Sequence, residues 1–352
     1  MEPTIKGRGS AENPANRFES TRFERDPESL DPDDPEPSPL TVLIPDRTRT
    51  IIATNDSPDV GFDASINPYR GCEHGCAYCY ARPGHEYLGL SAGLDFETKI
   101  HVKYDAPGLL RRELMKPAWV PKVIAMSGVT DAYQPAERKL KITRGCLEVL
   151  AEFRNPVAII TKNRLVARDA DILSDMAKDN AAGVFVSVTS LDADLARSLE
   201  PRASTPTARL EAIAALAKAG VPVGVAVAPV IPGLTDHEMP AILKAAAAAG
   251  ARTAFYTMLR LPLGVADLFS EWLDRHAPLA KEKVLGRLRG MRDGRLNDAR
   301  FGHRMGGDGA HADLIRTVFR TSVARVGLDR PFPELSTAGF RRPGQVQLSL
   351  FD

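Results

Sequence analysis

From about residue 120 onward, runs of apolar and β-branched residues alternate with amphipathic segments. Continuous apolar runs of this length predict strands that are buried on both faces. The predicted strands are 122–128, 157–161, 183–190, 221–230 and 253–259, preceded by a shorter one at 64–70.

The segments between these runs have the periodicity of helices. In 138–153, Ile142, Cys146, Val149 and Phe153 recur on one face, and 164–179, 205–220 and 237–250 are similar. Alternating strands and helices predict an α/β fold with a parallel sheet. About six strand-helix units predict an incomplete (β/α)6 barrel rather than a complete barrel of eight. Functional residues in such folds gather where strands end and loops begin.

The two ends of the chain differ from this pattern. Residues 1–40 contain ten acidic and five basic residues, many prolines and few apolar residues, which predicts a disordered acidic tail. Residues 41–290 form the predicted core domain with its lead-in, and 291–352 form a basic extension. A long helical stretch is expected at 265–292. The segment 281–304 has eight Lys or Arg residues against three acidic ones, and the chain is expected to end in an irregular tail.

The composition predicts the cellular compartment of the protein. Four cysteines in 352 residues are too few for a disulfide framework, and the first residues lack an apolar signal-peptide core. The apolar run 219–234 contains three prolines, so we interpret it as a buried strand rather than a membrane span. We therefore expect a cytoplasmic protein without membrane association. A formal net charge of +1 does not by itself favour any partner.

Three of the four cysteines lie within eight positions. Cys72, Cys76 and Cys79 have the spacing C-x3-C-x2-C, and three thiolates in one loop suit a soft metal centre. One interpretation is zinc, with His74 or His85 as the fourth ligand. The other is a [4Fe-4S] cluster with three irons bound by cysteine and the fourth iron open to a ligand. Cys146 is expected to be a buried core residue.

The extended string "NPYRGCEHGCAYCYAR" resembles the signature of the radical S-adenosylmethionine superfamily, with the aromatic Tyr78 directly before the last cysteine. Together with "VTDAYQPAE", "ITKN", "LEPRASTP" and "APVIPGLTD", it looks like the subgroup related to spore photoproduct lyase, often labelled DNA-repair-photolyase-like. The resemblance covers roughly residues 40–290.

This resemblance implies an enzyme with two cofactors. The open iron of the [4Fe-4S] cluster would bind S-adenosylmethionine. One electron from a flavodoxin- or ferredoxin-type donor would then cleave it to methionine and a 5′-deoxyadenosyl radical that removes a hydrogen atom from the substrate. The protein would supply orientation and exclusion of water.

Polar residues at the carboxyl ends of the predicted strands are candidates for binding the second cofactor. The resemblance places its amino group near Thr130 and Asp131 and its carboxylate near Lys162. Ser187 and Thr189 are candidates for the ribose hydroxyls. Further candidates are Tyr78 and Arg209, the latter a weaker one for a carboxylate clamp.

Each of these candidates has a structural alternative. Asp131 is also placed to cap a turn, and Lys162 to be a solvated charge. Glu200 and Arg202 suit a structural ion pair as well as a substrate site. His74, His85 and Tyr80, which flank the cysteines, suit support of the loop as well as catalysis.

One departure from spore photoproduct lyase concerns the return of a hydrogen atom to the product radical. The lyase uses a cysteine just before the segment that corresponds to Thr130-Asp131, whereas this chain has Ser127, Gly128 and Val129 there. A hydrogen donor, if the reaction needs one, would be Tyr133 or another tyrosine.

The leading hypothesis is a radical enzyme that acts on nucleic acid, with DNA as the first candidate. Alternatives are a radical enzyme that modifies RNA, protein or a small metabolite, and a non-catalytic, metal-stabilised module that binds nucleic acid through 281–304. The last residues add a possible partner, because "QLSLF" resembles the pentapeptide by which bacterial proteins bind the sliding clamp. Its anchors would be Gln347, Leu348, Leu350 and Phe351, and the alternative is that they dock on the core.

Overall fold

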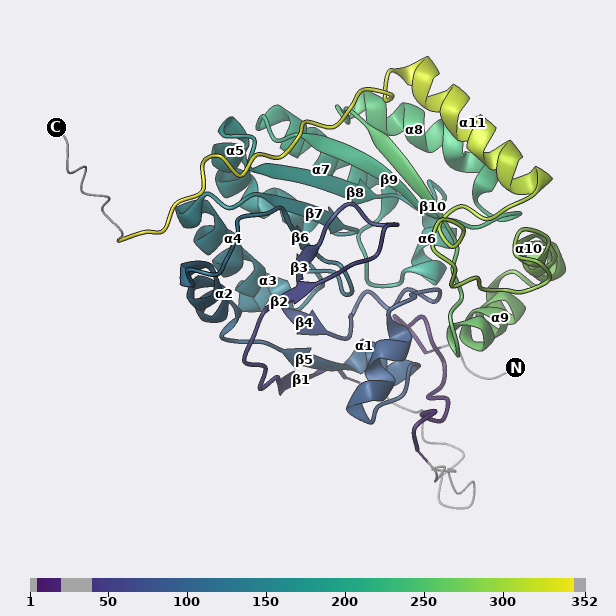
Figure 1. Ribbon diagram of the computed structural model, residues 1–352. Coiled ribbons are helices and arrows are strands. Elements are labelled where there is room, and N and C mark those ends of the chain that lie inside the picture. Colours follow the sequence, from purple (N-terminus) through teal and green to yellow (C-terminus); the bar gives the residue numbers. More distant parts are fainter. Residues whose placement is uncertain (1–4, 20–39, 345–352) are drawn as a thin grey trace.

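The computed structural model describes residues 5–19 and 40–344, and its centre is a seven-stranded sheet (Figure 1). The strand order is β10-β9-β8-β7-β6-β3-β2. Six strands run parallel to their neighbours, and only β2 (Ile52–Thr54), at one edge, is antiparallel. The parallel strands are β3 (Ala64–Ile66), β6 (Ile124–Met126), β7 (Val157–Thr161), β8 (Ala182–Ser187), β9 (Val223–Val230) and β10 (Ala254–Met258). Each lies within one of the predicted runs, apart from β8, which begins one residue earlier than predicted, so the parallel α/β class is confirmed.

Helices cover the sheet and bury it. They are α4 (Ile142–Phe153), α5 (Ala170–Lys178), α7 (Pro206–Lys218) and α8 (Met239–Ala248), and Figure 1 shows them around the strands. Val184 and Val225 belong to the main hydrophobic core, where each fully buried side chain contributes about 1.5–3 kcal/mol. Cys146 is 0% exposed within this core, which confirms its predicted structural role.

Several predicted helices are divided. The predicted segment 138–153 comprises α3 (Glu137–Leu140) and α4, separated by Lys141 in the left-handed region at φ 54°. The long helix predicted at 265–292 is α9 (Val265–His276) followed by α10 (Pro278–Gly290), because Pro278 cannot continue a helix but suits the first turn of the next one. Short 3-10 turns, η3 (Arg164–Asp169) and η4 (Asp236–Glu238), precede α5 and α8.

A second, three-stranded sheet lies beside the main one and was not predicted. Its order is β1-β5-β4, and it comprises β1 (Val42–Pro45), β4 (Tyr69–Arg70) and β5 (Lys99–Val102). The 3-10 helix η2 (Arg82–Leu88), α1 (Leu94–Thr98) and α2 (Ala106–Met115) belong to the same part of the chain, and α6 (Ala193–Leu199) follows β8. Strands of two to four residues are too short to show a periodic pattern.

The prediction of a 1–40 tail without packed structure is wrong for residues 5–19. Arg8, Ser10 and Asn16 are buried there. Asn16, for example, donates hydrogen bonds to the carbonyls of Glu86 and Leu90. Polar side chains make these contacts, so a prediction of disorder that is based on low apolar content does not detect them.

The C-terminal extension, which is expected to be helical or irregular and to end in an irregular tail, contains α11 (Ala310–Val326), which packs on α8. Beyond α11 the chain passes the ends of the strands towards α4 and α5 (Figure 1). Phe332 lies 4.7 Å from Phe185 between ring centroids, and the amide of Ser336 donates to the carbonyl of Asn180, just before β8. The C-terminal segment therefore covers the amino ends of the strands. The clamp-like residues 347–351 lie outside the described residues.

None of the helices in the described ranges is long and apolar enough to span a bilayer.

The contact between the C-terminal segment and β8 can be tested with a methyl group. A Cβ atom at Gly183 would lie 2.4 Å from Cε1 of Phe332, so Gly183→Ala should lower the free energy of unfolding by about 1–3 kcal/mol. Denaturant titration measures the change. Gly286→Ala in α10 is the control, because no atom lies within 4 Å of that Cβ position, and it should gain about 0.4–1 kcal/mol. If Gly183→Ala lowers the free energy of unfolding equally in a Phe332→Ala background, the C-terminal segment is not the cause of the loss.

Candidate functional site

The three clustered cysteines lie in the loop that follows β3 and β4, between the sheet and α1. The amide of Cys72 donates to the carbonyl of Phe96 at 2.9 Å, and the amide of Ala77 donates to the carbonyl of Leu199 at 2.9 Å. The loop is therefore held by α1 on one side and by the end of α6 on the other. All three cysteines are free thiols.

The N-terminal segment closes the outer side of this loop. The amides of Gly9 and Ser10 donate to the carboxylate of Glu97 at 3.0 and 2.9 Å. Arg82, also fully buried, forms an ion pair with the same carboxylate and donates to the carbonyl of Cys76 at 3.0 Å. Gly9 and Gly75 approach so closely that a Cβ atom at Gly9 would lie 1.8 Å from the Gly75 carbonyl oxygen. Glu97 thus joins the N-terminal segment to the cysteine loop.

The donor set suits a cluster of several metal ions better than zinc. Burial raises the pKa of the Cys72, Cys76 and Cys79 thiols, so their ionisation requires a bound cation. Both candidate histidines are engaged elsewhere. His74 Nε2 lies 3.0 Å from the Asn163 amide nitrogen, and His85 Nε2 lies 2.9 Å from the carbonyl oxygen of Lys99.

Within residues 5–19 and 40–344, no three His, Cys, Asp or Glu side chains are arranged to hold one metal ion. An iron-sulfur cluster does not require three side chains around one ion, because each of its cysteines binds a different iron. The cysteine loop therefore fits such a cluster, which Cys72, Cys76 and Cys79 would hold.

A network of polar side chains lies beside the loop at the carboxyl ends of β7, β8 and β9. Lys162 Nζ donates to Ser187 Oγ at 2.8 Å, to Thr189 Oγ1 at 3.2 Å and to the carbonyl of Ala228 at 2.7 Å. It also lies 3.1 Å from Oε1 of Glu200. The lysine is thus not the solvated charge of the alternative interpretation, and three predicted site residues meet at one point.

Glu200 is the centre of this network, a role that the sequence did not single out. It accepts hydrogen bonds from the Tyr78 hydroxyl, from Thr189 and from Arg209. Burial alone would raise the pKa of Glu200, but the charges of Arg209 and Lys162 hold it well below its usual range. The carboxylate therefore stays ionised and links the cysteine loop, through Tyr78, to the strands.

Arg209 is almost fully enclosed by this arrangement. It is 1% exposed, forms an ion pair with Glu200 and donates to the carbonyls of Ser187 and Ser204. The structure thus favours a structural role for Arg209 over the clamp that the sequence suggested. The partner of Arg202 is Glu73, at 3.0 Å, rather than Glu200.

Asp131 joins β6 to β7. Its carboxylate accepts hydrogen bonds from the amides of Tyr133 and Lys162, each at 2.8 Å, and from Thr161 Oγ1 at 2.7 Å, and it lies 3.4 Å from His74 Nδ1. The first of these bonds is the predicted turn cap. Thr130 is buried and donates to the carbonyl of Tyr69 at 3.0 Å.

Tyr133 does not join the site. It is 0% exposed in the main hydrophobic core, whereas Cys76 and Tyr78 belong to a second hydrophobic cluster. Burial and the nearby carboxylate of Asp169 raise its pKa far above the usual range. The turn at Asp131 directs Tyr133 inward, so the interpretation of this residue as a hydrogen donor facing the cysteines is not supported by its position.

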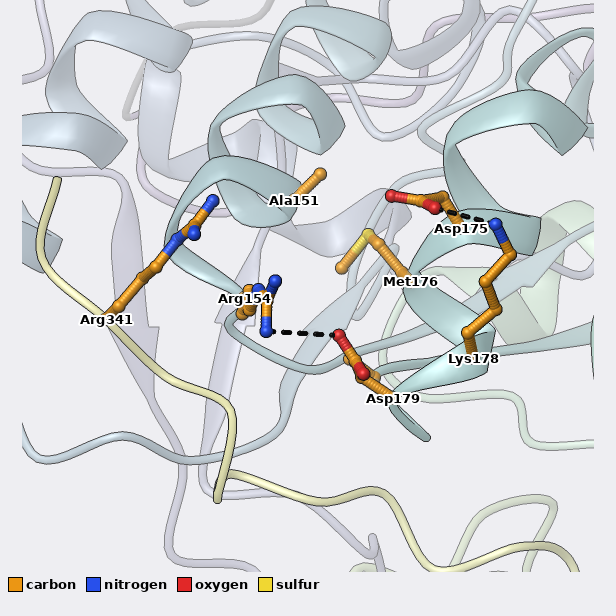
Figure 2. A pocket seen from close by; sticks show the side chains of 8 residues that line it. Ala151, Arg154, Asp175, Met176, Lys178, Asp179 and Arg341 are labelled. Carbon is orange, nitrogen blue, oxygen red and sulfur yellow. Dashed lines mark hydrogen bonds and ion pairs between the residues drawn. The ribbon is translucent and has the colours of Figure 1, made fainter.

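One pocket lies away from these residues, between the ends of α4 and α5 (Figure 2). Its volume is about 290 Å³, and its charges pair with one another, Arg154 with Asp179 and Lys178 with Asp175. A second pocket of about 220 Å³ borders the cysteine loop and is lined by Gly71, Ala81 and Thr130, among others. Proximity to the thiols, rather than size, distinguishes the second one.

Comparisons with known proteins agree with this geometry. Residues 66–246 match the sequence model described as "Radical SAM superfamily". An uncharacterised protein of Mycobacterium tuberculosis is 39% identical over 219 residues, covering 62% of this chain and 64% of the relative. An uncharacterised protein of Methanocaldococcus jannaschii is 31% identical over 173 residues, covering 49% and 62%. The chain thus spans less than two thirds of the length of these relatives.

Solved structures of spore photoproduct lyase have a similar fold. A mutant with bound AdoMet and dinucleoside spore photoproduct aligns with a TM-score of 0.57 at 17% identity, covering 82% of this chain and 80% of the lyase. The complex with dinucleoside spore photoproduct alone gives a TM-score of 0.57 at 16% identity, covering 81% and 79%. At this identity the likeness establishes the fold.

The contact between Gly9 and Gly75 predicts a local effect of a single methyl group. Gly9→Ala should displace the N-terminal segment, because the clashing atom is backbone, and lower the free energy of unfolding by about 1–3 kcal/mol. Trypsin should then cleave after the normally buried Arg8 at least about tenfold faster, as mass spectrometry would show. Gly84→Ala is the matched control, since its Cβ position is open. Equal cleavage rates at Arg8 in both variants would contradict the contact.

Proposed function

Because the chain belongs to the radical SAM superfamily, we propose that it is an enzyme that uses a [4Fe-4S] cluster and S-adenosylmethionine to abstract hydrogen from a nucleic acid, with DNA as the first candidate. The observation that carries this proposal is the position of three free, buried cysteines beside the Lys162 network at the carboxyl ends of the strands. Superfamily members use both cofactors, and the donor set here fits them.

When bound, the two cofactors supply a carbon-centred radical. The protein's part is to hold them in place and exclude water. Cys72, Cys76 and Cys79 would hold the cluster. Lys162, whose side chain is 17% exposed beside the hydroxyls of Ser187 and Thr189, would turn its ammonium group to the carboxylate of S-adenosylmethionine. Glu200, 3.1 Å from its Nζ, would hold that lysine in orientation.

Asp131 would act indirectly in this scheme, through the backbone of Lys162. Its oxygens accept hydrogen bonds from backbone amides on both sides and from Thr161. It therefore fixes the backbone position of Lys162, which is a positioning role rather than a direct contact with the amino group. Asp131→Asn distinguishes the two roles, because it would remove the negative charge but leave most of the turn intact. A positioning role would therefore largely survive the substitution, whereas a direct charge contact would not.

The lyase-like part of the proposal rests on similarity of fold and on the shared loop. The chain has no cysteine other than Cys146 outside the loop, and that residue is in the core. A hydrogen-return step through a thiol of the kind expected from the lyase therefore has no candidate here. This favours a reaction that ends differently from the one carried out by spore photoproduct lyase.

The non-catalytic alternative has less support. It depends on the basic segment 281–304, but much of this charge is paired, Lys281 with Asp274, Arg287 with Asp236 and Arg300 with Asp298. The proposed partners are an electron donor of the flavodoxin or ferredoxin type and, through residues 347–351, the sliding clamp. A cytoplasmic location is part of the same proposal.

The cysteine assignment predicts a sharp difference among four variants. After anaerobic reconstitution with iron and sulfide, Cys72→Ala, Cys76→Ala and Cys79→Ala should each lose the brown chromophore and the formation of 5′-deoxyadenosine, because each removes one cluster ligand. Cys146→Ala should retain both. Stoichiometric zinc without iron in anaerobically purified wild type would refute the proposed function.

The role of Lys162 predicts a loss of affinity without a loss of cluster. Lys162→Met should keep its full iron content and bind S-adenosylmethionine about ten- to a hundredfold more weakly, because a charge-assisted contact contributes about 1.5–3 kcal/mol. Equilibrium dialysis of cluster-loaded protein measures the affinity. Lys178→Met, which removes an exposed lysine paired with Asp175, is the control. Unchanged affinity in Lys162→Met would remove this residue from the site.

A further inference from the structure

Two exposed aromatic rings, each with an arginine over its face, are found in the cysteine loop and in the segment after α10. Tyr80 directly follows the last cysteine, is 48% exposed, and donates its hydroxyl to the carbonyl of Gly128 at 2.8 Å. The guanidinium of Arg260 lies over the Tyr80 ring, 5.5 Å from its centroid. Arg304 lies over the ring of Phe301 at 4.6 Å, and that ring is 55% exposed. We call Tyr80, Arg260, Arg304 and Phe301 the rim.

Packing places the rim next to the thiols. Leu259 and Leu261, on either side of Arg260, are buried in the same hydrophobic cluster as Cys76 and Tyr78. The segment that follows β10 is therefore fixed against the cysteine loop. Arg260, between the two leucines, lies on the partly exposed side of this contact.

Arg260 lacks a strong partner within the described residues. Its buried Nε–H has no hydrogen-bond acceptor, no carboxylate lies within ion-pair distance, and Nη1 contacts only the sulfur of Met305 at 3.8 Å. Arg304, by contrast, forms an ion pair with Asp59 and donates to Ser57. A half-buried guanidinium with an unused donor is costly, since desolvation is not offset by a hydrogen bond.

The surrounding charge adds to this cost. Burial and the positive charge of Arg304 lower the pKa of Arg260, and burial and the charge of Arg260 lower the pKa of Arg292 to about 10. Arg260 is thus repelled by the guanidinium of Arg304 and repels that of Arg292. Asp59 is bound by Arg304, and Asp298, near Arg292, is bound by Arg300. An anion at the rim would relieve this repulsion.

The shape of these groups indicates which class of anion the rim would bind. A guanidinium presents a planar fork of donors that matches the oxygens of a phosphate, and an exposed aromatic ring offers a face on which a base stacks. Exposed apolar side chains, Val129 and Leu263, flank the two loops that carry Tyr80 and Arg260. A phosphate alone would not use these surfaces, whereas a nucleotide within a chain would.

We propose that the rim binds a polynucleotide, with one backbone phosphate on Arg260 and an adjacent base stacked on Tyr80 or Phe301, next to the cysteine loop. This inference rests on the proposed function, because it treats the side of the loop that carries Tyr80 as the substrate's side. It assigns the substrate class to a surface formed by the cysteine loop, the segment after β10 and the segment after α10.

Binding of a labelled oligonucleotide tests the rim without turnover. The probe is a fluorescein-labelled 12-mer of deoxythymidine, titrated with the full chain at low salt and followed by fluorescence polarisation. Arg260→Gln should weaken binding about ten- to a hundredfold and reduce the slope of log K against log salt by about 0.7, as expected for one phosphate contact to a single strand. Arg260→Lys keeps the charge but loses the fork, so it should show a smaller loss.

Two controls separate the rim from general effects. Arg320→Gln removes an exposed arginine of α11 and should bind like wild type, and equal melting temperatures exclude misfolding of the variants. A uridine 12-mer that binds more tightly than the deoxythymidine one would support the rim and identify RNA as the source of the phosphate. Displacement of the probe by an oligoglutamate of equal charge, as effective as by unlabelled oligonucleotide, would overturn the proposal.

The proposal also fails if wild type shows no saturable binding or if Arg260→Gln binds as tightly as wild type. Formation of 5′-deoxyadenosine by the same preparations reports on the proposed function separately. Cofactor cleavage without oligonucleotide binding would reject the rim alone, whereas absence of iron and cleavage would reject the enzyme.

Discussion

The arrangement of the site depends on the buried carboxylate of Glu200. This residue contacts Tyr78 from the cysteine loop, Thr189 from the end of β8, Lys162 from the end of β7 and Arg209 from α7. Ion pairs of this kind are costly to desolvate and contribute little net stability compared with an apolar core. Their benefit is geometric, because each partner is held at a fixed place relative to the others. Loss of Glu200 would leave a buried, unpaired arginine beside the thiols.

Glu97 serves the opposite side of the cysteine loop in a similar way. It joins the buried Arg82 to the backbone of the N-terminal segment, and the carbonyl of Cys76 accepts a hydrogen bond from the same arginine. The loop itself has few regular hydrogen bonds, so its shape is imposed by these two carboxylates and by the backbone contacts to Phe96 and Leu199. A loop that must present three sulfurs to one cluster requires such support from outside.

The sequence predicts the sheet well and the supports poorly, and the reason is physical. Strands such as β7 and β9 are buried on both faces and appear as continuous apolar runs. Cys72, Cys76 and Cys79 are close together in sequence, so their spacing alone predicts a metal loop. Glu97 gives no periodic signal, because its partners Gly9 and Ser10 are distant in the chain. Arg82 gives none either, because it is held by Glu97 and by backbone carbonyls. The burial of Tyr133 in the main core could not be read from the sequence, because the direction of a side chain after a turn depends on contacts such as the Asp131 cap.

The two ends of the parallel sheet have different roles. Their charged residues are distributed accordingly. At the amino ends, the segment after α11 covers the strands with Phe332 and with backbone hydrogen bonds, so this end contributes stability. At the carboxyl ends, the buried carboxylate of Glu200 completes the ion pairs of Arg209 and Lys162 inside the protein. Among the described residues, Arg260 has no carboxylate partner, and its Nε–H has no hydrogen-bond acceptor. Under the proposed function, a phosphate of the substrate would supply the acceptor that these residues do not.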